Sequence, residues 1–187
     1  MRLGVLLLLI LGVVSCGQTP IPKPFAYHRA EFPQREIINI PFPNSPFSFD
    51  APRYSRFSPD PGQRPGMWLW TMPELKAEIF LSYHRIDTNF DGLVRDAFTL
   101  MQRHQVKASN VEMTPFTTKN TLSGGLIFRI EGPVACPYQF FITDSLSHFI
   151  RAELYFKSRP NPDSLQPALT HVLEDLRVMR ETLVWGG

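Results

Sequence analysis

The chain has 187 residues and a formal net charge of +2, and hydrophobic residues make up 43% of it against 19% charged residues. This length predicts one domain of ordinary size, and the composition excludes a wholly disordered chain because it supplies enough apolar side chains for a core. The sequence holds no long block of like charges, which excludes the basic or acidic tail that is typical of nucleic-acid binding.

The N-terminus predicts a lipoprotein signal peptide. The uncharged run Leu3–Val14 follows Met1-Arg2, and as a helix it would rise only about 18 Å, against about 30 Å for a hydrocarbon core. It ends in Val13-Val14-Ser15-Cys16-Gly17, the aliphatic, small, cysteine order of a bacterial lipobox. We therefore expect residues 1–15 to be removed and Cys16 to carry a diacylglycerol thioether and an amide-linked acyl chain such as palmitate. The alternatives are an ordinary secretory signal with an incidental cysteine and a transmembrane anchor.

Acylation at Cys16 sets two further expectations. Two or three acyl chains hold a protein firmly on a membrane, so no other anchor is needed. Because Cys16 is consumed, Cys136 has no second cysteine to pair with, and we expect no disulfide.

Proline marks the next part of the chain, because 12 of the 18 prolines lie between Pro20 and Pro73. The spacing of Pro20, Pro22 and Pro24 predicts an extended tether over residues 16–36. Residues 37–73 are also rich in phenylalanine and predict a wrapping arm, with edge strands at 37–40 and 47–50 and a turn-rich loop at 58–66.

Two tryptophans, Trp68 and Trp70, end this arm in the bulky sequence GMWLW. One interpretation is core packing, or a staple between the arm and the sheet. The other is a partner-binding surface, because tryptophan is a common interface anchor.

Residues 74–187 predict the core of a single globular domain that spans 37–187. Residues 76–85 alternate with period two, as a strand does, and residues 92–106 have the apolar stripe of a helix. Three more strands are expected at 122–131, 138–144 and 149–157, and the short turns at 132–133 and 145–148 imply antiparallel pairing. The chain ends in a helix from about Ser164, capped by Asp163 or Ser164, that lies on the sheet or forms a short coiled-coil seam.

These elements predict an α+β fold. We expect an antiparallel β-sheet with an inserted helix and a C-terminal helix packed on it, preceded by the Pro-rich N-terminal arm.

The segment Asp87-Thr88-Asn89-Phe90-Asp91-Gly92 matches the opening of a calcium-binding loop, with Asp87, Asn89 and Asp91 as candidate ligands. Position twelve of that loop is Phe98, so the bidentate carboxylate that completes such a site is missing. The alternative is a strand-to-helix turn in which Asp91 caps the helix. We expect no metal, with a weak calcium site as the second possibility.

A hydrolytic site could be built from Ser145 or Ser147 with His148 and Asp144, which adjoin one another at a turn. Catalytic triads are defined by spatial geometry, and the chain has no G-x-S-x-G motif, so this adjacency carries little information. The five histidines form no H-x-x-x-H pair. We expect no catalytic residues and no cofactor beyond the covalent lipid.

The chain as a whole resembles one family. The resemblance rests on the lipobox, PKPFAYHR at 22–29, PELKA at 73–77, QFFITDS at 139–145, HFIR at 148–151, LYF at 154–156, PNPDSL at 160–165 and ETL at 181–183 with Trp185. In this order they are similar to the gliding-motility lipoprotein GldD family of the Bacteroidota.

The resemblance implies a non-catalytic membrane lipoprotein of the gliding machinery, which is tied to type IX secretion. Its partners would be the membrane and other gliding or type IX secretion proteins, with no nucleic acid and no small-molecule substrate. Surface-displayed lipoproteins of these bacteria tend to carry acidic residues directly after the cysteine, and the first here is Glu31. We therefore expect a cell-envelope protein, anchored in the outer membrane by preference, with its domain facing the periplasm.

Overall fold

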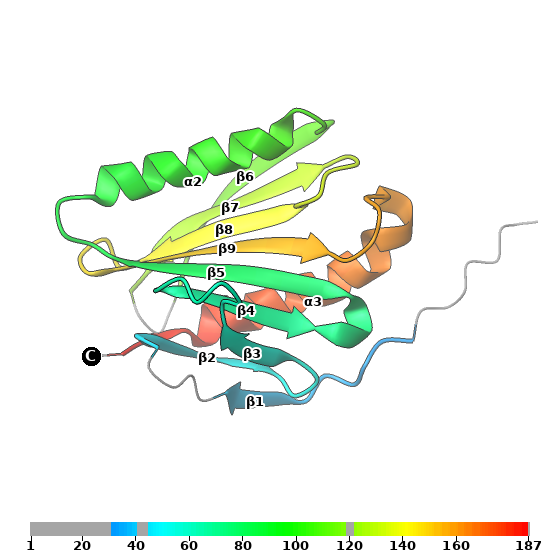
Figure 1. The fold of residues 1–187 in the computed structure, drawn as a ribbon, viewed down its shortest axis with the longest axis horizontal. Helices are drawn as coiled ribbons and strands as arrows, with labels where there is room; N and C mark the ends of the chain where they lie inside the picture. Colours follow the sequence, from blue (N-terminus) through cyan, green and yellow to red (C-terminus); the bar gives the residue numbers. More distant parts are fainter. Residues whose placement is uncertain (1–30, 41–44, 119–121, 187) are drawn as a thin grey trace, which may run out of the picture. The chain divides into compact units, whose positions relative to one another are not determined.

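The computed structural model describes residues 31–40, 45–118 and 122–186. A seven-stranded sheet in the order β3-β4-β5-β9-β8-β7-β6 dominates this part of the chain, and all of its neighbouring strands are antiparallel (Figure 1). The strands in chain order are β3 Arg56–Pro59, β4 Met67–Met72, β5 Ala77–Arg85, β6 Asn110–Thr117, β7 Gly124–Glu131, β8 Tyr138–Thr143 and β9 His148–Phe156.

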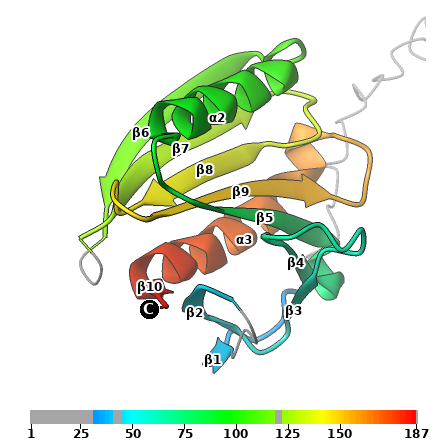
Figure 2. The ribbon, with the colours of Figure 1, turned by 60° about the vertical axis from the view of Figure 1, so that its left-hand side comes forward.

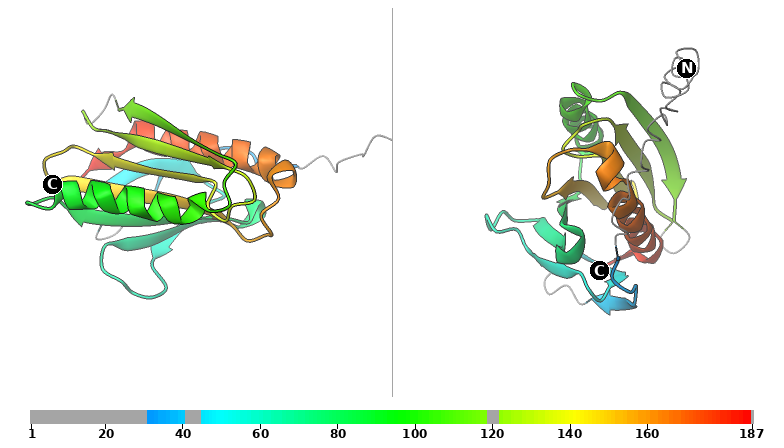
Figure 3. Two further views of the ribbon diagram at one scale, coloured as in Figure 1. Left: turned by 90° about the horizontal axis from the view of Figure 1, so that it is seen from above. Right: turned by 90° about the vertical axis from the view of Figure 1, so that its right-hand side faces the viewer.

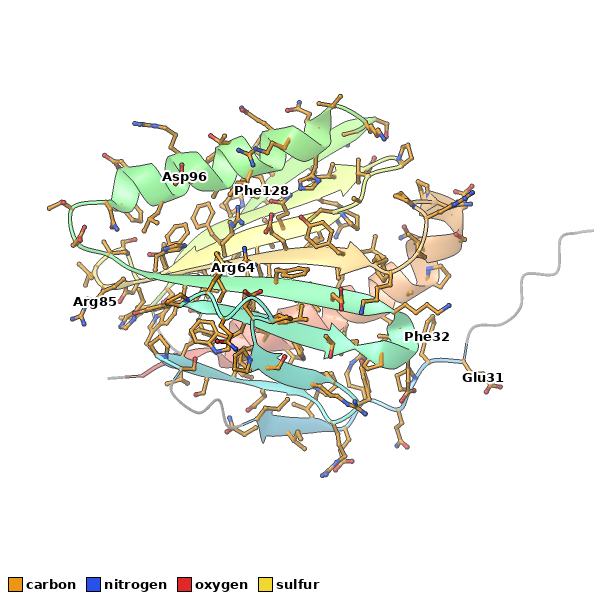
Figure 4. The ribbon with its side chains drawn as sticks, in the orientation of Figure 1. Glu31, Phe32, Arg64, Arg85, Asp96 and Phe128 are labelled. Atoms are coloured by element: carbon orange, nitrogen blue, oxygen red, sulfur yellow. The ribbon has the colours of Figure 1, made fainter. Side chains whose placement is uncertain are left out.

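Two α-helices cover opposite faces of this sheet within the described residues (Figures 2 and 3). Helix α2, Phe90–Gln105, is inserted between β5 and β6, and helix α3, Pro162–Thr182, follows β9. Alternate residues of each strand face the two helices, so each face has its own core. Ala97 and Met101 of α2 pack on the face that holds Phe128, which is labelled in Figure 4.

The core on the α3 face is the larger one and includes part of the N-terminal arm. A second, three-stranded sheet joins β1 Ile37–Ile40, β2 Phe47–Pro52 and β10 Val184–Trp185, with β2 in the centre. Phe47 and Phe49 of β2 are buried in the same core as Val172, Leu176 and Met179 of α3. The apolar stripe of α3 therefore packs on the sheet, which is the first of its two predicted roles, and does not form a coiled-coil seam.

The structure confirms the α+β class, the antiparallel sheet, the inserted helix and the C-terminal helix. It also confirms the strand at 37–40 and places the other predicted strands within about two residues of their expected ends, as is usual for pattern-based boundaries. Helix α2 begins at Phe90, two residues before the prediction, and α3 begins at Pro162. The cap of α3 is Asn161, whose side chain accepts a hydrogen bond from the Ser164 backbone N–H at 3.4 Å, so the prediction of Asp163 or Ser164 was wrong.

Residues 56–72 of the predicted wrapping arm form strands β3 and β4 of the main sheet and the loop that connects them. Strand β4 pairs with β5 along six residues, from Met67 opposite Ser82 to Met72 opposite Ala77. Ser58 and Pro59, placed in a loop by their turn-forming neighbours, lie in β3, which is an edge strand and tolerates proline. Strand β6 is the opposite edge, contains Pro115 and lacks a clear alternation, which is why the sequence did not predict it.

Candidate functional site

The predicted lipidation site, Cys16, lies outside the described residues, as does the predicted tether up to residue 30. The structure does place the last part of that tether. Arg35 Nε lies 2.6 Å from Asp175 Oδ1 of α3, and Arg35 Nη2 donates to the His171 carbonyl at 3.0 Å. The Phe32 ring stacks on the His171 imidazole with centroids 5.0 Å apart, near the first described residues in Figure 4. Within the predicted tether, Phe32 and Arg35 are therefore packed on α3.

A buried polar network holds this attachment. The Asp175 side chain is 0% exposed, and its second carboxylate oxygen accepts a hydrogen bond from the Tyr54 hydroxyl. His171 Nε2 lies 3.0 Å from the same hydroxyl. Burial and the bond to Asp175 raise the pKa of Tyr54, whereas burial and the Arg35 charge lower the pKa of His171. Tyr54 therefore donates as a neutral phenol, and the network joins the segment before β1, the turn after β2 and helix α3.

The calcium-like segment is a turn between β5 and α2. The Asp87 backbone N–H donates to Asn89 Oδ1 at 3.2 Å, the Asp87 carboxylate accepts from the Thr88 N–H, and Asn89 Nδ2 is 3.4 Å from the Arg85 carbonyl. Asn89 is the N-cap residue of α2, so Asp91 lies in the first turn rather than at the cap. Among the described residues no three His, Cys, Asp or Glu side chains come together in a way that could hold a metal ion.

Replacing Gly92 with alanine is expected to stabilise the protein by about 0.5 kcal/mol, because Gly92 is an exposed helical residue and alanine is the better helix former. A Cβ atom at this position meets nothing within 4 Å. Urea unfolding measures the change. Gly132→Ala is the matched control and should destabilise, because Gly132 has a φ of +115° and a Cβ there would lie 2.9 Å from the Lys107 carbonyl. Destabilisation by both variants would show that Gly92 acts as a turn glycine, as a calcium loop requires.

The hydrolase candidates surround a tight turn between β8 and β9. Asp144 Oδ1 accepts from the backbone N–H groups of Leu146, Ser147 and His148, each at 2.9 Å. Burial raises the pKa of Asp144, but these bonds together lower it. The His148 Nδ1 atom lies 2.9 Å from the Tyr83 hydroxyl, and the His148 ring stacks on Trp185 at 4.9 Å. Asp144 thus orders the turn backbone and does not orient the imidazole, unlike the carboxylate of a catalytic triad.

The two tryptophans have different environments. Trp70 is 0% exposed and packs on Phe49 of β2 with ring centroids 5.2 Å apart. Trp68 is partly exposed, and the centroid of its ring lies 5.1 Å from that of the Phe47 ring. Both rings therefore staple β2 to the main sheet, and the alternative of a partner-binding surface does not apply to Trp70 as the chain is folded here.

A groove that the sequence analysis did not identify lies on the α2 face of the sheet. It has a volume of about 460 Å³ and adjoins a second cavity of about 150 Å³. Strands β5 and β9 form the floor of both cavities. The loop between β3 and β4 forms a wall of the larger cavity, and helix α2 forms a wall of the smaller one. Arg64 and Asp96, labelled in Figure 4, come from these two walls. The sequence did indicate that each of the two floor strands has a mainly polar face. These polar residues are Glu78, Ser82 and His84 on β5 and Arg151, Glu153 and Tyr155 on β9.

Arg151 is the central residue of this groove. It lines both cavities, and its side chain is only 16% exposed. Its Nη2 atom donates to Glu153 Oε2 at 2.8 Å, whereas Nη1 is buried without a hydrogen-bond partner. A buried donor left without an acceptor costs about 1–3 kcal/mol, and more for a charged group. None of the described residues therefore supplies the acceptor that this nitrogen needs.

The positive charge of Arg151 helps to lower the pKa of two nearby histidines. Burial and the Arg151 charge lower the pKa of His84, against a smaller opposing effect of Asp96. Burial lowers the pKa of His104 more than Glu153 raises it, and Arg151 adds to the lowering. Both imidazoles are therefore neutral at pH 7, so the positive charge beside them is that of the guanidinium.

The described part of the chain includes no helix that is both long and apolar enough to cross a membrane. No match is found among curated proteins. The solution structure of cyanobacterial PsbP (CyanoP) from Synechocystis sp. PCC 6803 is similar at 11% identity and a TM-score of 0.47, over 82% of this chain and 94% of that one. A family model described as "Gliding motility lipoprotein GldD" matches residues 17–185. Because this match covers nearly the whole chain, the protein belongs to the gliding motility lipoprotein GldD family.

Proposed function

We propose that this protein is a membrane-anchored, non-catalytic component of the machinery for gliding motility and type IX secretion. The observation that carries the proposal is the family match over residues 17–185. The lipobox ending at Cys16 supports it independently, because that motif directs acylation of the cysteine. In this proposal the anchor includes an amide-linked palmitate, the membrane is the outer membrane, and the domain faces the periplasm.

The anchored chain is fixed to the domain at Phe32 and Arg35. Arg35 and Phe32 contact α3 through Asp175 and His171. Residues 16–30 would then be the part that spans between lipid and domain, at most about 3.5 Å per residue when fully extended. A tether of that reach suits a protein that contacts partners near the membrane surface.

The alternative functions gain no support from the geometry. Asp87 and Asn89 bond to the backbone of their own turn. Asp144 does the same at the next candidate site, and His148 is held by Tyr83 and Trp185. These arrangements suit structural turns, and we propose neither a calcium module nor a hydrolase.

Replacing Cys16 with alanine is expected to abolish both palmitate incorporation and membrane association, because the thiol is the attachment point of the lipid. Labelled palmitate and membrane fractionation of cells measure the two effects. Cys136→Ala is the matched control and should incorporate label normally, since Cys136 is buried in the domain. A Cys16→Ala protein that still pellets with membranes would overturn the anchoring proposal.

Crosslinking in intact cells tests the partner class. We expect the acylated protein to capture gliding or type IX secretion proteins, and the Cys16→Ala protein to capture fewer of them. Capture of cytoplasmic or nucleic-acid-binding proteins alone would contradict the proposal.

A further inference from the structure

Arg151, whose Nη1 atom is buried without a hydrogen-bond partner, lines a groove that has the dimensions of a ligand site. Small-molecule sites range over about 300–1,000 Å³, and the larger cavity measures about 460 Å³. Met67, Ser82 and Arg151 line both this cavity and its smaller neighbour. Ser82 lies directly opposite Arg151 in the register of β5 and β9, so a hydroxyl and a guanidinium are side by side on the groove floor.

The other charged side chains that line the larger cavity already have partners. Asp60 binds Arg64 at 2.8 Å, and Glu78 binds the Lys157 ammonium at 2.6 Å. Glu153 takes one side of the Arg151 guanidinium, which leaves Nη1 as a donor without an acceptor. Guanidinium groups have only donors, so the missing partner must be an acceptor atom.

A carboxylate fits this environment better than a phosphate does. Three acidic side chains, Asp60, Glu78 and Glu153, line the groove, and they would repel a dianion more than a single negative charge. A carboxylate oxygen would also accept a charge-assisted hydrogen bond from Arg151 Nη1. Phe80 and Tyr155, whose rings meet edge to face at 5.5 Å, offer an apolar floor beside the charged end.

We propose that the groove binds a carboxylate-bearing ligand whose carboxylate accepts hydrogen bonds from Arg151 Nη1 and Ser82 and whose apolar part lies against Phe80. Arg151 Nη1 is covered in the structure, so the ligand reaches it when a neighbouring side chain moves. Met67 is suited to this movement, because an unbranched methionine changes rotamer easily. The carboxylate could be that of a free organic acid or the C-terminus of a peptide.

Calorimetric titration of the acylated mature protein in detergent tests the proposal with four probes. These are benzoate, a short peptide ending in phenylalanine with a free carboxylate, the same peptide with an amidated C-terminus, and inorganic phosphate. Binding of benzoate alone would identify a small acid as the ligand type, and binding of the free-carboxylate peptide would identify a peptide terminus. Absence of binding by both, equal binding of the amidated peptide, or stronger binding of phosphate would each overturn the proposal.

Two variants assign the binding to Arg151. Arg151→Gln should lower the affinity for the carboxylate probe about tenfold or more, since a charge-assisted hydrogen bond is lost. Arg177→Gln is the matched control, because Arg177 is an exposed arginine on α3 paired with Glu174 and Glu181, and it should bind as the parent does.

Glu153→Gln keeps the proposal falsifiable if the Arg151 variant does not fold. Removing this negative charge should tighten carboxylate binding, because it removes a repulsive charge beside the ligand and replaces the ion pair at Arg151 Nη2 with a weaker neutral acceptor. A purely structural role of the Arg151–Glu153 pair predicts weaker or unchanged binding instead. Unchanged affinity in both variants would show that the probe binds elsewhere and that solvent alone satisfies Arg151.

Discussion

Replacing Asp175 with alanine is expected to lower the free energy of unfolding by about 3 kcal/mol, the lower end of the range for a broken buried ion pair. The Asp175 carboxylate is fully buried and binds both Arg35 and the Tyr54 hydroxyl. Its loss leaves both donors without their acceptor. The effect stays at the lower end because the Arg35 side chain is 28% exposed and can be partly hydrated. Urea unfolding of the variant and the parent measures the difference.

The neighbouring Glu174 provides the control. It is an exposed carboxylate that pairs with Arg177 one turn along the same helix. Glu174→Ala should cost no more than about 1 kcal/mol, since exposed ion pairs contribute little. Equal effects of the two substitutions would mean that the Asp175 network is not what fixes the N-terminal segment to α3.

Replacing Trp70 with alanine is expected to cost about 3–5 kcal/mol, the range for the loss of a large buried aromatic side chain. Trp70 lies in the core between β4 and β2, in contact with Phe49. The variant loses this apolar contact area, and β2 loses one of its contacts with the main sheet. Because β2 is the centre of the small sheet, we expect near-ultraviolet circular dichroism to change together with the unfolding midpoint in urea.

Trp70→Phe separates the packing of the ring from its polar edge. The Trp70 Nε1 atom is buried without a hydrogen-bond partner, so phenylalanine removes an unsatisfied donor together with part of the ring. We expect the phenylalanine variant to lose less than half of the stability that the alanine variant loses. Equal losses would indicate that the indole nitrogen makes a contact that matters for stability.

The alternation of apolar and polar residues along the chain made several strands of this fold predictable. Residues 76–85 and 149–157 alternate with period two, and they form β5 and β9 near the centre of the sheet. Strands without that pattern were missed. Strand β4, with the sequence MWLWTM, carries large apolar residues on both faces, and β6 is an edge strand with a proline in it.

The candidate sites depended on contacts that the sequence does not show. Arg35 and Asp175 are separated by 140 positions, and nothing local in the proline-rich segment marks Arg35 as half of an ion pair. Ser82 and Arg151 meet only because β9 pairs with β5, although helix α2 and strands β6, β7 and β8 separate these two strands in the sequence. The polar alternation of each strand was visible, but the register that joins them is a property of the folded sheet.

A deletion strain tests the central claim, a role in gliding and type IX secretion, most directly. We expect the strain to lose surface spreading and to retain type IX cargo proteins inside the cell. The full-length gene should restore both, whereas a gene encoding Cys16→Ala should restore neither, because its product lacks the lipid anchor. Normal spreading together with normal secretion in the deletion strain would contradict the account.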